Sequence, residues 1–175
     1  MFTFVSGGLR SGKSSYALRR ASELGPPPWL YVAPEVEGDE DLKNRLATQR
    51  RDQDAIWRVR DASAHLEEAL TAEVIEGHGA MVLDRFNLWL SGRVVSPHGP
   101  DDDAKLLEEV ERFCDRLYHC PVPVVLVTTE IGLGSPPVND QERRLANVVG
   151  IANQILAERA QSVVFMVSGI AQRLR

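Results

Sequence analysis

The feature that most constrains the fold of this chain is a glycine-rich loop near its N-terminus, Gly7-Gly8-Leu9-Arg10-Ser11-Gly12-Lys13-Ser14. The loop follows an apolar, β-rich run at residues 2–6, and its spacing is G-x-x-x-x-G-K-[ST]. Glycines allow backbone angles closed to other residues, so successive N–H groups can converge on phosphate oxygens. A helix starting near Lys13 would point its positive dipole end at the same oxygens. The sequence therefore predicts a strand, a phosphate-binding loop and a helix, in that order.

Two side chains of this loop carry the predicted chemistry. Lys13 would place a compact cation against the β- and γ-phosphates of a nucleoside triphosphate, and the Ser14 hydroxyl would complete the coordination of Mg²⁺. The alternative is a glycine turn followed by a Lys-Ser pair by chance, but the strand before it and the helix after it favour the phosphate site. We therefore expect a nucleoside triphosphate as substrate and Mg²⁺ as cofactor. The expected nucleotide-binding residues of the loop are Gly7, Gly8, Leu9, Arg10, Ser11, Gly12, Lys13 and Ser14.

Carboxylates that follow apolar runs are the second candidate feature. Asp84 follows the run at residues 80–83, and we expect it to act with Ser14 on Mg²⁺, as a Walker-B-like acid does. Its alternative role is the N-cap of a helix beginning at Asn87. Glu130 follows a second apolar run and is expected to contribute to the phosphate site, although strand ends also carry solvated acids. The sequence leaves open whether Asp84 or Glu130 holds the metal.

Five apolar runs predict strands, and two amphipathic patterns between them predict helices. Apolar residues repeat at intervals of three and four over residues 106–117 and 145–156. Strands that alternate with helices indicate an α/β fold with a mostly parallel sheet, in which ligands bind beyond the carboxyl ends of the strands. The predicted strands are residues 2–6, 29–33, 81–84, 122–128 and 163–168.

Composition limits the remaining classes. With 175 residues and 43% hydrophobic content, the chain is expected to form one domain over residues 1–175. The formal net charge of -5 argues against binding nucleic acid through a broad basic surface. No run approaches the roughly 20 apolar residues of a membrane span, and the N-terminus does not resemble a signal peptide, so a cytoplasmic protein is expected. Cys114 and Cys120 lack zinc-ligand spacing and are expected to be free thiols.

Several blocks resemble a known family in the same order along the chain. The loop resembles the GGxRSGKS loop of the bifunctional adenosylcobinamide kinase/adenosylcobinamide-phosphate guanylyltransferase family of cobalamin biosynthesis. The resemblance spans nearly the whole chain. The further blocks are Leu30-Tyr31-Val32-Ala33, Asp39-Glu40-Asp41, Arg45-Leu46, Trp57-Arg58, Leu83 to Ser91, Val127 to Gly132, Pro137-Val138-Asn139, Arg143, Gly150 to Gln154 and Val167 to Ile170.

The resemblance implies a P-loop NTPase fold with a RecA-like sheet, and commonly a homotrimer. It also implies two reactions. The first is phosphorylation of the aminopropanol hydroxyl of adenosylcobinamide by ATP or GTP. The second is transfer of GMP from GTP to that phosphate, through a covalent GMP on a histidine.

The chain departs from the family pattern at that histidine. Counting forward from Arg45, or back from Trp57, places Gln49 at the position. Glutamine has no basic nitrogen that could form a phosphoramidate, so nucleophilic catalysis by this residue is lost. His65 is the nearest histidine, and an exposed helix position is its simpler interpretation. The family usually has Phe-Arg-Asp where this chain has Leu145-Ala146-Asn147.

Three functions remain open from the sequence. The first is an adenosylcobinamide kinase, with the guanylyltransferase activity in doubt because of Gln49. The second is a non-catalytic or regulatory nucleotide-binding paralogue, and the third is another small-molecule P-loop kinase. Trp57 and Trp89 are large enough to stack on a corrin or purine ring, but core packing is the interpretation we favour.

Overall fold

The computed structural model describes residues 1–34, 39–48, 56–62, 66–96, 102–134 and 136–175. The strands are β1 (Phe2–Gly7), β2 (Trp29–Ala33), β3 (Trp57–Asp61), β4 (Ala80–Leu83), β5 (Val124–Val127), β6 (Ser162–Val167) and β7 (Ile170–Arg173). The α-helices are α1 (Lys13–Leu24), α2 (Glu40–Thr48), α3 (Ala72–Ile75), α4 (Phe86–Val95), α5 (Asp103–Tyr118) and α6 (Asp140–Arg159). Two short 3₁₀ helices are η1 (Leu66–Leu70) and η2 (Ile131–Leu133).

The strands form one seven-stranded sheet in the order β3-β2-β4-β5-β1-β6-β7. Every neighbouring pair is parallel except β6 and β7, which form an antiparallel pair at one edge. The predicted α/β fold with a mostly parallel sheet is therefore confirmed. Strand β1 lies between β5 and β6, in the interior of the sheet. The loop that follows β1 therefore lies at the edge formed by the carboxyl ends of the parallel strands.

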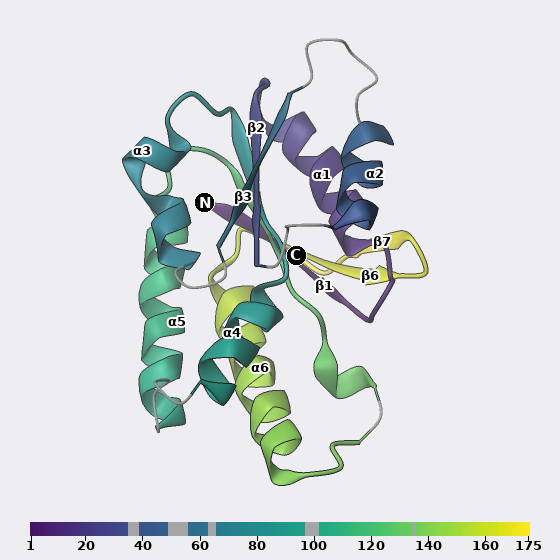
Figure 1. Ribbon diagram of the computed structural model, residues 1–175, viewed down its shortest axis with the longest axis vertical. Coiled ribbons are helices and arrows are strands. Elements are labelled where there is room, and N and C mark those ends of the chain that lie inside the picture. The colour runs from purple at the N-terminus through teal and green to yellow at the C-terminus, as the bar shows by residue number, and fades with distance from the viewer. Residues whose placement is uncertain (35–38, 49–55, 63–65, 97–101, 135) are drawn as a thin grey trace.

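Helices cover both faces of the sheet (Figure 1). On one face, α1 and α2 pack on the cluster that contains Val5, Tyr31 and Val82. On the other face, α4, α5 and α6 pack on the cluster that contains Phe4 and Leu83. Alternate residues of β1 and β4 thus enter opposite clusters, which explains why these strands are continuously apolar.

Two strands were absent from the prediction, and both lie at an edge of the sheet. Strand β3 has the sequence WRVRD, and only Trp57 in it is buried. Strand β7 has the sequence IAQR, and all four of its residues are exposed. Edge strands bury few side chains, so their sequences lack the apolar run that marks an interior strand.

The predicted strand at residues 122–128 and the predicted strand at residues 81–84 differ in length or position from the observed ones. Strand β5 covers only Val124–Val127, and Pro123, which has no N–H to donate, precedes it. Strand β4 ends at Leu83, so Asp84 stands just beyond it. The backbone N–H of Asp84 still donates to Val32, at 2.9 Å, and this bond continues the ladder between β4 and β2 by one residue.

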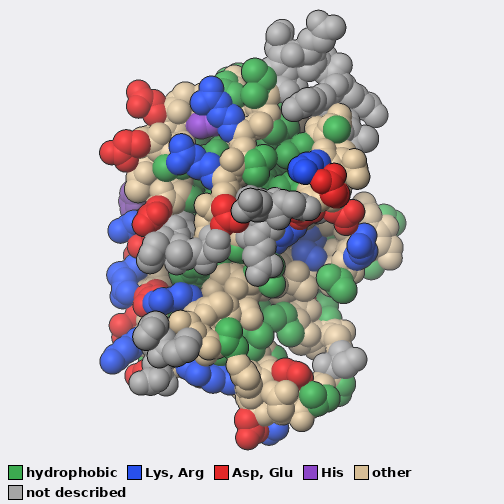
Figure 2. Space-filling model, viewed as in Figure 1, with side chains coloured by type: hydrophobic (Ala, Val, Ile, Leu, Met, Phe, Trp, Pro, Cys, Tyr) green, Lys and Arg blue, Asp and Glu red, His purple; other side chains and the backbone are tan. Residues whose placement is uncertain are grey.

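Neither the charged surface along α5 nor the two cysteines indicates a further functional site. Acidic and basic side chains are interspersed along the flank formed by α5 (Figure 2). None of the helices described is long and apolar enough to cross a membrane. Both cysteines are free, and burial raises the pKa of Cys114 to about 12, so its thiol stays protonated at neutral pH.

Candidate functional site

The loop after β1 is shaped by two glycines in conformations that other residues rarely adopt. Gly7 has φ 149° and Gly12 has φ 93°, and helix α1 begins directly after Gly12. A Cβ atom added to Gly7 would lie 2.5 Å from the carbonyl oxygen of Met166, and one added to Gly12 would lie 3.2 Å from Cα of Gly169. The end of β6 and the turn that follows it therefore support the loop, and a side chain at either glycine would crowd these backbone atoms in a conformation that favours glycine.

Lys13 lies inside this loop rather than on its surface. Its side chain is mostly buried, and Nζ donates a hydrogen bond of 2.6 Å to the carbonyl oxygen of Gly8. Burial lowers the pKa of Lys13, while the negative charges of Asp84 and Glu130 act to raise it. The ammonium group is thus held within the field of both candidate carboxylates. An anion bound in the loop would add to that field and favour the charged form.

Asp84 is buried, with 3% of its surface exposed. Its Oδ2 accepts a hydrogen bond of 2.7 Å from the Tyr31 hydroxyl, and its Oδ1 accepts one of 2.7 Å from the backbone N–H of Arg85. Helix α4 begins at Phe86, and its N-cap residue is Arg85, with no side-chain capping bond. The alternative role of Asp84 as N-cap of a helix from Asn87 is therefore not what the structure shows.

A cavity of about 610 Å³ joins the phosphate loop to Asp84. Its wall also includes the exposed side of α2, the first turn of α4 and one residue after β5. Glu130 is not in the wall, and its backbone N–H donates to Gly7 at 3.1 Å. The lining residues are Leu9, Arg10, Ser11, Gly12, Lys13, Ser14, Ser15, Asp41, Asn44, Asp84, Arg85, Asn87, Leu88 and Thr129.

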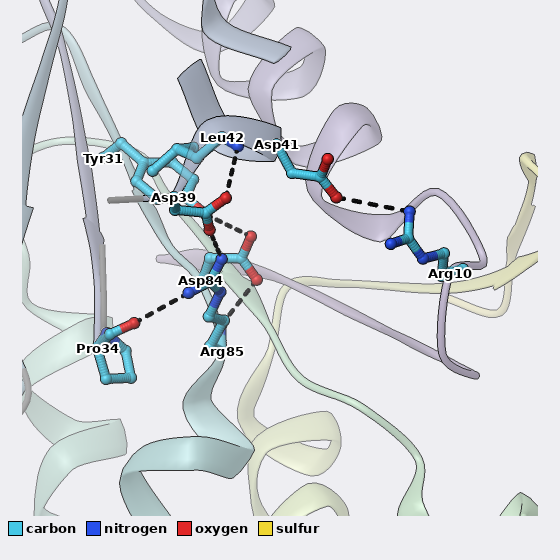
Figure 3. Close-up of polar contacts among 8 residues, drawn as sticks. All are labelled: Arg10, Tyr31, Pro34, Asp39, Asp41, Leu42, Asp84 and Arg85. Carbon is cyan, nitrogen blue, oxygen red and sulfur yellow. Dashed lines mark hydrogen bonds and ion pairs between the residues drawn. The ribbon is translucent and has the colours of Figure 1, made fainter. Parts of the chain in front are cut away.

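Helix α2 is fixed over this cavity by charged contacts at its N-terminus (Figure 3). Asp39 caps the helix by accepting a 2.8 Å bond from the Leu42 N–H, and it also pairs with the Arg85 guanidinium. Arg85 donates a second bond, of 3.2 Å, to the carbonyl oxygen of Pro34. Burial acts to lower the pKa of Arg85, but the bond to Asp39 and the charges around it outweigh this effect and raise the pKa.

A further ion pair connects the same helix to the loop. Arg10 lies 3.5 Å from Asp41, and both side chains are exposed. The sequence places Arg10 in the loop but by itself assigns no role to Asp41, Asn44 or Arg85. For Asp41 and Arg85, the only signal is that the blocks Asp39-Glu40-Asp41 and Leu83 to Ser91 belong to the family pattern, and Asn44 lies outside every such block.

Trp57 and Trp89 lie in the core and not in the cavity. Trp57 is 8% exposed and packs against Trp29 with ring centroids 5.3 Å apart. Trp89 is 5% exposed and packs against Phe86 at 5.5 Å. Core packing, the interpretation favoured by the sequence, is therefore confirmed. Gln49 and His65 lie outside the described residues, and so no contact of either is described.

The donor set around the loop suits a magnesium–nucleotide complex. Ser14 and Asp84 both line the cavity and offer a hydroxyl and a carboxylate oxygen. The buried Ser11 hydroxyl has no hydrogen-bond partner among the described residues, and a phosphate oxygen could supply one. In the part of the chain that the structure describes, no three His, Cys, Asp or Glu side chains gather as a metal cage. Mg²⁺ needs no such cage, because it is bound by one or two protein ligands together with phosphates and water.

A parallel sheet whose first strand leads into this loop, with a carboxylate at the end of a neighbouring strand, defines a P-loop nucleotide-binding protein. The match to known families is more specific. The family model described as cobinamide kinase / cobinamide phosphate guanyltransferase matches residues 3–174. The chain belongs to this family, whose members are kinases and nucleotidyltransferases, and it is an enzyme of that class.

Curated relatives match the chain along its whole length. The chain is 33% identical over 175 residues to the bifunctional adenosylcobalamin biosynthesis protein CobP of Pseudomonas aeruginosa, covering 100% of this chain and 98% of that protein. It is 28% identical over 184 residues to the bifunctional adenosylcobalamin biosynthesis protein CobU of Salmonella typhimurium, covering 100% of both.

Solved structures of low sequence identity share the fold. The flagellar accessory protein FlaH from Methanocaldococcus jannaschii superposes with a TM-score of 0.57 at 11% identity, covering 99% of this chain and 77% of that chain. A solved ATPase domain superposes with a TM-score of 0.53 at 12% identity, covering 94% of this chain and 68% of that chain. The RecA-like P-loop fold that the family resemblance implies is confirmed by these similarities.

Proposed function

We propose that this chain transfers a phosphoryl group from ATP or GTP to the aminopropanol hydroxyl of adenosylcobinamide. The observation that supports this proposal is the cavity in which the phosphate loop, Lys13 and Asp84 meet. Phosphoryl transfer requires little covalent help from a protein, because positioning and neutralisation of charge supply most of the catalysis. A loop cation beside a buried carboxylate is the arrangement that this chemistry needs.

In this proposal the loop from Gly7 to Ser14 binds the phosphates through its backbone N–H groups. Lys13 leaves the Gly8 carbonyl oxygen to neutralise the β- and γ-phosphates. Ser14 and Asp84 would hold Mg²⁺, which supplies charge stabilisation to the transferring phosphoryl group. Both carboxylates act on Lys13 through their charge, but Asp84 is the better candidate for the metal because it lines the cavity and Glu130 does not.

The guanylyl step of the family depends on a histidine that this chain lacks at the matching position. By the family resemblance the step passes through a histidine, and Gln49 stands at that position. A carboxamide nitrogen does not form a phosphoramidate, so we propose that any GMP transfer by this chain proceeds without a covalent GMP at residue 49.

Two incubations test the proposal. The purified protein with adenosylcobinamide, Mg²⁺ and γ-labelled ATP or GTP should yield labelled adenosylcobinamide phosphate, and with α-labelled GTP alone it should carry no acid-labile GMP. Nucleotide binding without a phosphorylated product would contradict the kinase and favour the non-catalytic paralogue. Phosphorylation of a different small alcohol in place of adenosylcobinamide would favour another P-loop kinase.

The assembly follows the family resemblance, and the location is the one expected from the sequence. We propose a cytoplasmic homotrimer whose subunits each consist of one domain over residues 1–175. Light scattering coupled to gel filtration should then give three times the 19.4 kDa mass of the chain. A mass equal to one chain would contradict the trimer and leave the kinase proposal untouched.

A further inference from the structure

Tyr31 is a buried residue whose hydroxyl reaches the edge of the candidate site. It lies in the middle of β2, has 0% of its surface exposed, and belongs to the cluster beneath α1 and α2. Phenylalanine would fill the same space without a polar atom. Because a buried hydroxyl is costly unless it is hydrogen-bonded, the acceptor that it reaches is informative. That acceptor is Asp84 Oδ2, at 2.7 Å.

The sheet register brings these two residues together. Tyr31 pairs with Val82 across the parallel ladder of β2 and β4. Side chains two residues apart in a strand point to the same face, so Asp84 follows Val82 on the face that Tyr31 occupies. The bond from the Asp84 N–H to Val32 keeps this alternation one residue beyond the end of β4. The tyrosine side chain therefore runs along the sheet toward the carboxylate, as Figure 3 shows.

The other oxygen of the carboxylate is also held by a hydrogen bond. Oδ1 accepts the backbone N–H of Arg85, a residue in the left-handed conformation with φ 60°. An ionised carboxylate oxygen can accept a second bond beside such a donor. The carboxylate can therefore still bind a metal or water while both donors hold it, and Asp84 lines the cavity that also contains Ser14.

We propose that Tyr31 is a positioning residue for the metal-binding carboxylate: its hydroxyl fixes the orientation of Asp84 toward Ser14. This inference rests on the proposed function, since it takes Asp84 as the metal-binding acid. Tyr31 itself is not among the residues that line the cavity. Partners that orient a metal-binding side chain from behind commonly change metal affinity by about 10- to 100-fold when they are removed.

The test compares Tyr31→Phe with the matched control Tyr16→Phe. Tyr16 packs partly buried against the same cluster but faces a different cavity. Mn²⁺ replaces Mg²⁺, and free Mn²⁺ is measured by electron paramagnetic resonance in the presence of saturating ATP. We expect Tyr31→Phe to weaken Mn²⁺ binding about tenfold and to lower kcat, with the affinity for ATP in EDTA unchanged. Tyr16→Phe should change none of these. Unaltered Mn²⁺ affinity in Tyr31→Phe would overturn the inference.

Asp84→Asn separates this inference from the proposed function. If Tyr31 acts through Asp84, then Tyr31→Phe should change Mn²⁺ affinity far less in the Asp84→Asn background than in the unaltered protein. A loss of affinity in Asp84→Asn with none in Tyr31→Phe would remove the positioning role alone. Unchanged affinity in Asp84→Asn itself would remove the metal assignment of the proposed function.

A second measurement keeps the proposal testable if Tyr31→Phe does not fold. The chain has 3 tyrosines, so uniform 3-fluorotyrosine labelling gives a small set of fluorine NMR signals. Tyr16→Phe and Tyr118→Phe assign two of them. Adding Mg²⁺ to the ATP complex should shift the Tyr31 signal and leave the other two in place. A Tyr31 signal that does not respond to Mg²⁺ would contradict the inference.

Discussion

At the scale of single residues, Lys13 combines the charge proposed to bind phosphate with an unfavourable position for that charge. Because burial lowers its pKa below the usual 10.5, folding favours its neutral form. The charged form therefore reduces stability at neutral pH, and this penalty disappears as the pH rises through the folded-state pKa toward the unfolded value. The proposed phosphate site would therefore give up some stability in order to keep this charge.

The first prediction follows from that position. Lys13→Met keeps the apolar stem and removes the charge, so the melting temperature of the ligand-free protein at pH 7 should rise. Nucleotide affinity should fall by about 10- to 100-fold, because a hydrogen bond to a charged group is lost. Calorimetry and equilibrium binding measure the two effects, and the exposed Lys105→Met on α5 serves as control. Unchanged nucleotide affinity in Lys13→Met would contradict the phosphate site.

The second prediction concerns the family nucleophile. Gln49→His places an imidazole at the position that the resemblance assigns to the covalent intermediate. Incubation with α-labelled GTP should then give an acid-labile, base-stable GMP adduct, which the unaltered protein lacks, since only the imidazole offers a nucleophilic nitrogen. A strong adduct in the unaltered protein that persists in Gln49→Ala and disappears in His65→Ala would instead reveal a relocated nucleophile.

At the scale of elements, the contact between α2 and the β4–α4 turn fixes one wall of the cavity. Asp39 does two things there, because one oxygen caps α2 and the other pairs with Arg85. Both side chains are mostly buried, with 23% of the Arg85 side chain and 13% of the Asp39 side chain exposed. Breaking the pair therefore leaves a partly buried guanidinium without this carboxylate.

The third prediction separates the two roles of Asp39. Asp39→Asn retains an oxygen for the Leu42 N–H but loses the charge, and it should reduce the free energy of unfolding by about 1–3 kcal/mol. Asp39→Ala loses the capping bond as well and should reduce the free energy of unfolding by about 1 kcal/mol more. Urea unfolding measures both, with the exposed Glu40→Gln as control. Equal losses in the two Asp39 variants would show that the capping bond contributes nothing.

At the scale of the whole molecule, nucleotide and metal would connect parts that are distant in sequence. The cavity wall takes residues from the phosphate loop, from α2, from the end of β4 and from the segment after β5. A ligand that contacts all of them binds only the folded chain, and so it stabilises the fold as a whole.

The fourth prediction states the size of that effect. Mg²⁺ with ATP or GTP at about 100 times its dissociation constant should stabilise the protein by about 2.7 kcal/mol. For a chain of this length the melting temperature should rise by about 5–10 °C. EDTA should remove the part of the rise in melting temperature that depends on metal. Lys13→Met should show a much smaller rise in melting temperature at the same nucleotide concentration. An equal shift in Lys13→Met would place the nucleotide elsewhere.

Much of the site could be predicted because its central part is contiguous. The strand, the loop and the start of α1 occupy the first residues of the chain in unbroken order, and each has a local signature. Asp84 was also predictable, because an acid at the end of an apolar strand meets the loop whenever parallel strands share a carboxyl edge. The edge strands β3 and β7 were missed because their charged or exposed residues carry no core pattern.

The amino-acid order alone determined the α/β class, the phosphate loop and the missing histidine at Gln49, since each of these is a property of neighbouring residues or of their spacing. Only the tertiary structure decided what surrounds Asp84. Its bond to Tyr31 joins residues 53 apart in the chain, and the pair of Arg85 with Asp39 joins residues 46 apart. Such contacts depend on strand order and register, which bring distant side chains to one face of the sheet, and no local pattern encodes that arrangement.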